Sequence, residues 1–160
     1  GLLTPATKRL VEGEHETVRP SVQSHAPLQD KLKSRLTGMI DLIEANPHFH
    51  RLVLDQIYGK SAQNRENELL SRVTARGLTL TVSMLHDTPN TPVRAVDPRF
   101  LHVALIGLTE FFTSAEPLLR ELFGPNTPPE EIKQRYIDFL TDLILNGVQS
   151  EPDKPSANSN

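Results

Sequence analysis

The fold is decided by one stretch, residues 97–113, whose sequence is DPRFLHVALIGLTEFFT. Asp97 followed by Pro98 is typical of a helix that begins with a capping side chain and a proline in its first turn. The apolar side chains that follow lie on nearly every side of the expected helix, so the helix must be covered on every side. In a domain of this size one face meets the domain's own core, and the opposite face needs another cover. The apolar residues are Phe100, Leu101, Val103, Ala104, Leu105, Ile106, Leu108, Phe111 and Phe112.

The chain after this stretch predicts a short turn and one more long helix. Glu116-Pro117 interrupts the first helix, and a single helical turn is expected over residues 118–123. Thr127, three residues before Glu130, predicts a capping box at the start of the last helix, which Gly147 is expected to end. The apolar residues of that helix form one broad stripe: Ile132, Tyr136, Ile137, Phe139, Leu140, Leu143, Ile144 and Leu145.

Three further segments precede the deciding stretch. A helix is expected over residues 28–45, where apolar residues recur at three- and four-residue spacing. Asn46-Pro47 stops that helix and caps a second one, which ends at Gly59. A third segment extends over residues 61–85, and its part from Leu78 to Met84 alternates like a half-buried strand. We favour a helix because the chain holds no second strand-like run to pair with it, and Gly77 would suit either a break or a tight helix contact.

Composition limits the classes of function. Residues 1–27 and 149–160 hold few large apolar side chains, so we expect a linker or disordered arm and a disordered tail around a domain at 28–148. The net charge of −3 argues against this chain binding a phosphate backbone by itself. There is no cysteine, which excludes thiolate metal sites, and the longest apolar run, residues 103–108, is too short to span a membrane. We expect a soluble cytoplasmic protein.

No set of residues predicts catalysis, a cofactor or a metal site. The chain has no glycine-rich phosphate loop, no cysteine nucleophile and no His-Glu-x-x-His motif. His48 and His50 are two residues apart, so on a helix they point roughly 200° away from each other and cannot chelate one ion. His102 could line a cavity or lie at a polar edge, and the edge is favoured. Asp138 and Asp142 indicate a solvated face rather than an acid/base pair.

The last two long helices together suggest a second molecule. Both have more apolar surface than one core contact uses, and large exposed apolar patches tend to mark interfaces. In a dimer with twofold symmetry each subunit would contribute this pair to a four-helix interface. The alternative is that loops or the N-terminal arm cover the extra face.

Three stretches resemble the C-terminal domain of the TetR/AcrR family of bacterial transcriptional regulators. They are residues 44–54 (EANPHFHRLVL), residues 96–108 (VDPRFLHVALIGL) with Phe111 and Phe112, and residues 136–148 (YIDFLTDLILNGV). Their order and separations agree with the family, and the resemblance covers about residues 28–148. It implies an all-α fold: an antiparallel bundle of five main helices and a short turn, which dimerises through the last two long helices.

The resemblance also implies a function. A small, largely apolar effector would bind in an apolar cavity between the central helices and control operator binding by a helix-turn-helix domain. Expected cavity residues, each of which could equally be plain core, are Met39, Ile43, Leu54, Met84, His102 and Phe111. Expected residues of the homodimer interface are Leu105, Leu108, Phe112, Tyr136, Phe139, Leu140, Leu143 and Ile144.

The family's helix-turn-helix is missing from this chain, and Gly1 at the start favours truncation over a natural loss of DNA binding. DNA would therefore be a partner only through the missing domain. The alternative function is a helical protein–protein interaction module without a small ligand. A solvent-accessible pocket of a few hundred Å³ would favour effector sensing, and a fully packed core would favour the interaction module.

Overall fold

The computed structural model describes residues 26–59, 68–86, 88 and 92–150. Within these ranges the chain forms six helices and no strand, which confirms the all-α prediction for the described part. The predicted N-terminal arm up to residue 25, residues 61–67 of the doubtful third segment and the tail from residue 151 lie outside the described residues. The helices are α2 (Leu28–Ala45), α3 (Pro47–Tyr58), α4 (Glu68–His86), α5 (Pro98–Ser114), α6 (Glu116–Phe123) and α7 (Pro129–Val148).

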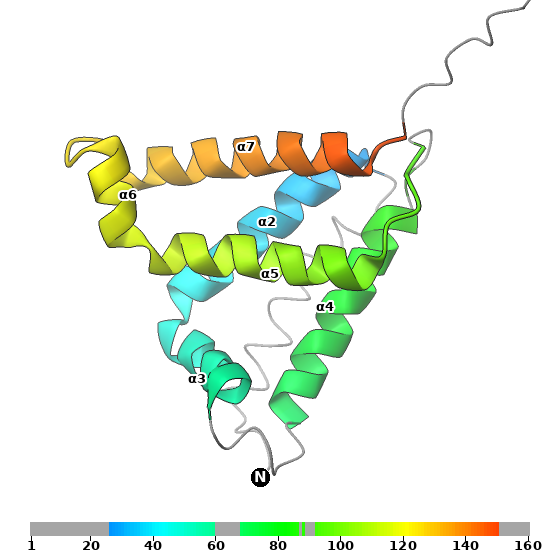
Figure 1. Ribbon diagram of the computed structural model, residues 1–160, viewed down its shortest axis with the longest axis horizontal. Coiled ribbons are helices and arrows are strands. Elements are labelled where there is room, and N and C mark those ends of the chain that lie inside the picture. The colour runs from blue at the N-terminus through cyan, green and yellow to red at the C-terminus, as the bar shows by residue number, and fades with distance from the viewer. Residues whose placement is uncertain (1–25, 60–67, 87, 89–91, 151–160) are drawn as a thin grey trace, which may run out of the picture.

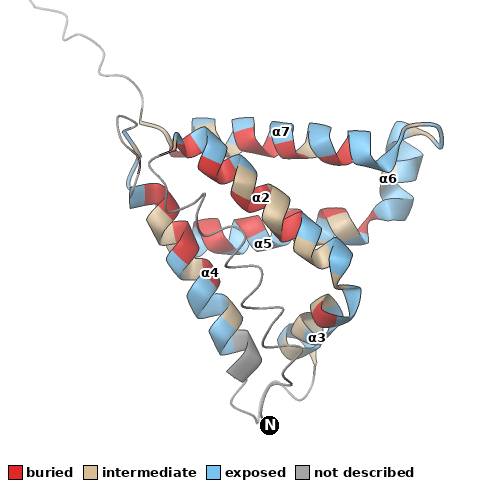
Figure 2. Ribbon diagram, turned by 180° about the vertical axis from the view of Figure 1, so that it is seen from behind, coloured by how far each residue is buried: buried red, intermediate tan, exposed pale blue. Residues whose placement is uncertain are grey.

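Helix α2 is the element around which the others pack, since it contacts α3, α4, α5 and α7. Helices α5 and α7 run in opposite directions, and α6 joins them at one end (Figure 1). The apolar spacing predicted for α2 is confirmed, because every residue of that stripe except the half-buried Ile43 is buried in one core with α4, α5 and α7. None of the residues of α6 is buried, whereas buried residues run along α2 and the upper half of α4 (Figure 2). The centre of the core includes Leu32, Leu36, Ile40, Met84, Leu105, Ile137 and Leu140.

A lysine on α7 fastens this helix to α2. The Lys133 ammonium donates to Asp41 Oδ1 at 2.6 Å and to Glu44 Oε2 at 2.7 Å, and the lysine side chain is only 10% exposed. Burial alone would lower the pKa of Lys133, but the hydrogen bonds to both carboxylates outweigh burial and raise it. Sequence reasoning missed this contact because its partners lie about 90 residues apart in the chain.

Helix ends follow the predicted capping residues only in part. Asp97 is confirmed as the N-cap of α5, because its Oδ1 accepts from the backbone N–H of Arg99 at 2.9 Å. Asn46 is confirmed as the N-cap residue of α3, with Pro47 in the first turn, but its side chain does not cap this helix: Nδ2 donates back to the carbonyl of Leu42 at 3.1 Å. The amide therefore satisfies the end of α2 instead of the start of α3.

The predicted capping box at the start of α7 is also wrong. In the described part of the chain Thr127 Oγ1 donates to the carbonyl of Phe123 at 2.7 Å, and the N-cap of α7 is Pro128, with no side-chain cap. A hydroxyl placed four residues after a free helix carbonyl can satisfy it directly, so this threonine ends α6. Gly147 does not end α7, which continues to Val148.

The segment before α5 pairs with the end of α7. Val93 and Gln149 form an isolated antiparallel bridge. The backbone N–H of Arg94 donates to Val148 O at 2.7 Å, and that of Ser150 donates to Pro92 O at 3.0 Å. This pairing holds the first turn of α5 beside the last turn of α7.

The alternating segment from Leu78 to Met84 is helical, as favoured, and Gly77 serves a tight helix contact rather than a break. A Cβ at position 77 would lie 2.5 Å from Cε1 and 2.9 Å from Nε2 of His102 on α5. The missing side chain therefore lets α4 approach α5 at the buried histidine ring.

We expect Gly77→Ala to destabilise the chain. The added methyl group must displace the buried ring of His102, so the free energy of unfolding should fall by about 1–3 kcal/mol, in spite of alanine's better helix propensity. Urea denaturation measures the change. Gly147→Ala is the matched control, since a Cβ there would meet no atom within 4 Å beyond its chain neighbours and its own helix backbone, and it should not lose stability. Equal effects of the two substitutions would contradict the tight contact.

Candidate functional site: an outer apolar face and an inner cavity

An apolar surface covers the outward side of α5 and α7. Its five large side chains are between 55% and 76% exposed. On α5 they are spaced so that they share one face of the helix, and on α7 they are one turn apart. We call this surface the outer face, and it consists of Phe100, Val103 and Phe111 of α5 with Phe139 and Leu143 of α7.

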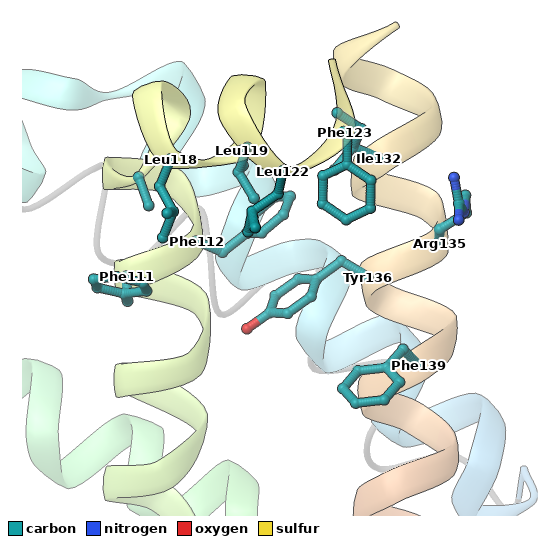
Figure 3. Close-up of a pocket in the computed structure, with 11 residues that line it drawn as sticks. Phe111, Phe112, Leu118, Leu119, Leu122, Phe123, Ile132, Arg135, Tyr136 and Phe139 are labelled. Atoms are coloured by element: carbon teal, nitrogen blue, oxygen red, sulfur yellow. The ribbon is translucent and has the colours of Figure 1, made fainter. Parts of the chain in front are cut away.

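A groove of about 560 Å³ opens at one end of the outer face, where α5, α6 and α7 meet (Figure 3). Phe111 and Phe139 belong both to the outer face and to the groove, so the two features are continuous. The guanidinium of Arg135 lies on the rim, 5.7 Å from the centre of the Phe123 ring. The lining is otherwise apolar or aromatic: Phe111, Phe112, Ala115, Leu118, Leu119, Leu122, Phe123, Ile132, Tyr136 and Phe139.

Tyr136 holds the two walls of the groove together. Its ring stacks on that of Phe112 with centroids 4.2 Å apart, and its hydroxyl donates to the carbonyl of Leu108 at 2.7 Å. Burial raises the pKa of Tyr136, so the hydroxyl stays protonated and can donate. One side chain of α7 thus makes both an aromatic and a polar contact with α5.

Tyr136→Phe should keep the stacking and lose only the hydrogen bond between α7 and α5. We expect the free energy of unfolding to fall by about 1 kcal/mol. Urea denaturation checks this, with Tyr58→Phe as the control because Tyr58 is 80% exposed. A loss no larger than that of the control would show that the hydroxyl does not fasten the helices.

A second, smaller cavity of about 100 Å³ lies among α2, α3, α4 and α5. We call it the inner cavity. It brings together three of the residues predicted for the effector site, Met39, Ile43 and Leu54. Its full lining is Met39, Leu42, Ile43, Phe49, His50, Val53, Leu54, Ile57, Val73, Ile106, Thr109 and Glu110.

Two polar side chains face each other in the wall of the inner cavity. His50 Nε2 of α3 lies 3.5 Å from Glu110 Oε1 of α5, and both side chains are mostly buried. Ser114 Oγ donates to the same carboxylate oxygen at 3.0 Å. Sequence reasoning considered His50 only as a metal ligand and missed the pair. A signal was available, because Glu110 is the one acidic residue between Pro98 and Thr113, within the apolar part of the stretch.

The structure does not bring the other three predicted cavity residues to the inner cavity. Met84 is 1% exposed in the main core, and Phe111 lies on the outer face. His102 is also buried, so the favoured polar edge is wrong: its Nδ1 lies 3.5 Å from Thr81 Oγ1, and Gly77 packs against its ring. Burial, with a smaller effect of the Arg35 charge, lowers the pKa of His102 to about 4.

The residues predicted for the dimer interface divide into three groups. Phe139 and Leu143 are exposed on the outer face. Leu108, Tyr136 and Ile144 are half-buried at its margin, against the core. The remaining three are buried in their own chain, where α2 packs against α5 and α7, and one of them, Phe112, also lines the groove. These three are Leu105, Phe112 and Leu140.

The described residues hold neither a metal-binding cluster nor a membrane-spanning helix. No three His, Asp or Glu side chains in these ranges lie where they could hold one metal ion. No described helix is both long and apolar enough to cross a membrane.

The family model described as "Tetracyclin repressor-like, C-terminal domain" matches residues 26–153, which include every helix described above. No curated protein and no solved structure shows a significant match to the chain.

Proposed function

Because this chain belongs to the family of tetracyclin repressor-like C-terminal domains, we propose that it is the effector-sensing and homodimerisation domain of a transcriptional repressor. Family membership supports a regulatory domain rather than an enzyme. The finer steps proposed here are that two copies of the chain share the outer face and that a small molecule binds in the inner cavity. DNA would be bound by a helix-turn-helix domain outside the described residues.

The homodimer is supported by the exposed apolar area of the outer face. Five large apolar side chains, more than half exposed and continuous with an apolar groove, are a surface that monomeric proteins rarely leave in water. Two antiparallel helices from each copy would form a four-helix interface about a twofold axis. The interface that we propose therefore includes Phe100, Val103 and Phe111, in addition to Phe139 and Leu143 from the sequence-based prediction.

The observation that carries the sensing role is the double use of α5. Ile106 and Glu110 of this helix line the inner cavity, while Phe111, the next residue, belongs to the outer face. A ligand that pushes on Ile106 or Glu110 would move the same helix that meets the second copy. Packed helices move as units, so such a shift would change how the two subunits are oriented.

A helical protein–protein interaction module without a small ligand remains the second candidate. It is favoured by the volumes of the groove and the inner cavity. The groove, at about 560 Å³, is larger than the inner cavity, at about 100 Å³. The inner cavity is smaller than the few hundred Å³ expected for a drug-sized ligand. An effector must therefore be small or displace side chains such as Met39 when it enters.

Native mass spectrometry on protein purified from its source host tests the proposal. We expect a species with the mass of two chains that carries a small molecule, which is released on collisional activation. A dimer without a retained molecule, and without response to added hydrophobic compounds, would favour the interaction module. A strictly monomeric and empty species would contradict both parts of the proposal.

A further inference from the structure

We infer that the effector of the inner cavity is a small neutral molecule with an apolar body and one hydroxyl group, held beside His50 and Glu110. This inference rests on the proposed sensing function, and it names the chemical class of the ligand. The apolar body follows from the lining, in which aliphatic and aromatic side chains from four helices surround two polar groups.

The polar pair is incomplete as it stands. His50 Nε2 is fully buried and has no hydrogen-bond partner among the described residues, because the carboxylate oxygen of Glu110 at 3.5 Å is not placed for one. Buried polar groups in folded proteins nearly always have a partner. His50 also lines the inner cavity. Because its Nε2 is covered in the empty cavity, a bound group would become its partner by displacing a neighbouring side chain.

The charge of Glu110 determines which ring nitrogen of His50 carries the proton. If Nε2 held a lone pair, it would face a carboxylate oxygen that can only accept, and two acceptors at this distance repel each other. The proton therefore lies on Nε2, which makes His50 a donor and Glu110 an acceptor. A ligand group that contacts both must accept one hydrogen bond and donate another.

A hydroxyl group does both with one oxygen atom. An ammonium group can only donate and would leave the His50 N–H unsatisfied, and a carboxylate can only accept and would be repelled by Glu110. The cavity size agrees with a small body, since a cavity of about 150 Å³ lined by aliphatic and aromatic side chains accepts benzene. At about 100 Å³, the inner cavity fits a phenol-sized molecule after small side-chain movements.

The test compares binding of phenol, toluene and benzylamine to the whole chain by ligand-observed NMR titration. Phenol and toluene differ only by a hydroxyl in place of a methyl group. We expect phenol to bind about tenfold more tightly than toluene, because its hydroxyl gains a hydrogen bond to a charged acceptor. Benzylamine should bind more weakly than phenol.

Substitutions of Glu110 and His50 then test whether these two residues cause the preference for phenol over toluene. Glu110→Leu and His50→Leu should each reduce the preference for phenol over toluene to less than about threefold, while toluene still binds. Glu110→Gln keeps the shape and one acceptor oxygen, and it should retain part of the preference if the leucine variant folds poorly. Glu121→Leu, at an exposed position of α6, is the matched control and should behave like the unmodified chain.

The outcomes separate this inference from the proposed function. Equal binding of phenol and toluene, or tighter binding of benzylamine than of phenol, would overturn the hydroxyl assignment and leave a ligand-binding cavity in place. Ile43→Trp fills the inner cavity and should abolish binding of all three probes. If binding survives this change, or if no probe binds to the unmodified chain, the inner cavity is not a ligand site and the proposed sensing role fails.

Discussion

Replacing Phe139 and Leu143 by glutamate should turn a dimer of this chain into a monomer. Both side chains are more than half exposed in the isolated chain, on the outward side of α7. In the dimer they are covered, so each substitution removes apolar contact and places a carboxylate where water is excluded. Because the dimer has twofold symmetry, each substitution is present twice in the interface. We expect the dissociation constant to rise at least about 100-fold, which corresponds to roughly 3 kcal/mol or more.

Light scattering after size-exclusion chromatography measures this change at a fixed protein concentration. The control is Tyr58→Glu, which puts the same charge at an apolar position that is 80% exposed on α3, away from the outer face. The control should keep the mass of two chains, and circular dichroism should show unchanged helix content in all variants. A double variant that keeps the dimeric mass would show that the outer face is not the interface.

Acidification should cost the chain roughly 3 kcal/mol of folding free energy through His102 alone. The pKa of this histidine is about 4 in the folded chain and 6.5 as the reference for the unfolded chain, because burial disfavours the charged ring and Arg35 adds a smaller repulsion. Between these values the unfolded chain binds a proton that the folded chain does not. The contribution of neutral His102 is therefore fully present above pH 6.5 and is lost as pH falls through the interval to about 4.

Urea denaturation at a series of pH values from 7.5 to 4 measures this slope, with the protein concentration fixed because dimerisation also stabilises the fold. His102→Gln should lower stability at pH 7.5 but make its fall with acid less steep, since the side chain no longer titrates. His86→Gln removes an exposed histidine at the end of α4 and should retain the slope of the unmodified chain. Identical slopes for the unmodified chain and His102→Gln would contradict a neutral buried histidine at neutral pH.

The helices could be predicted from the sequence because their signals are local. The apolar stripe of α2, the Asp97-Pro98 start of α5 and the end of α3 at Gly59 each depend on neighbouring residues. The predicted side-chain caps were wrong where a side chain could bond either to a carbonyl group of the helix before it or to an N–H group of the helix after it. Asn46 and Thr127 both donate a hydrogen bond to a carbonyl group of the helix before them. The sequence alone does not show which of the two helices such a side chain bonds to.

The sequence did not predict which face of α5 is turned toward the core of its own chain. A helix with apolar residues on every side has no polar stripe that marks the solvent side. Leu105 was therefore expected in the interface although it is fully buried in the core, and Phe111 was expected in the cavity although it lies on the outer face. The same holds for α7: Phe139 and Leu143 were expected in the dimer interface and are exposed, whereas Leu140, which was expected there as well, is buried in the chain's own core.

The polar contacts of the site depend on packing between distant segments. His50 meets Glu110 only because α3 and α5 both border the inner cavity, and the burial of His102 depends on Gly77, 25 positions away. Periodicity shows which residues share a helix face, but it does not show which faces meet. Three of the residues expected in the cavity, Met39, Ile43 and Leu54, line the inner cavity together and lie on the neighbouring helices α2 and α3.

The central claim is that a second copy of the chain covers the outer face, and thiol labelling tests it most directly. The chain has no cysteine, so Leu143→Cys introduces a single thiol on the outer face and Tyr58→Cys a single thiol on α3. We expect the thiol at position 143 to react with a maleimide at least about tenfold more slowly than the thiol at position 58, and to become reactive when the protein is diluted through its dissociation constant. Equal rates at every protein concentration would contradict the shared interface, and so would protection of position 143 that dilution does not relieve.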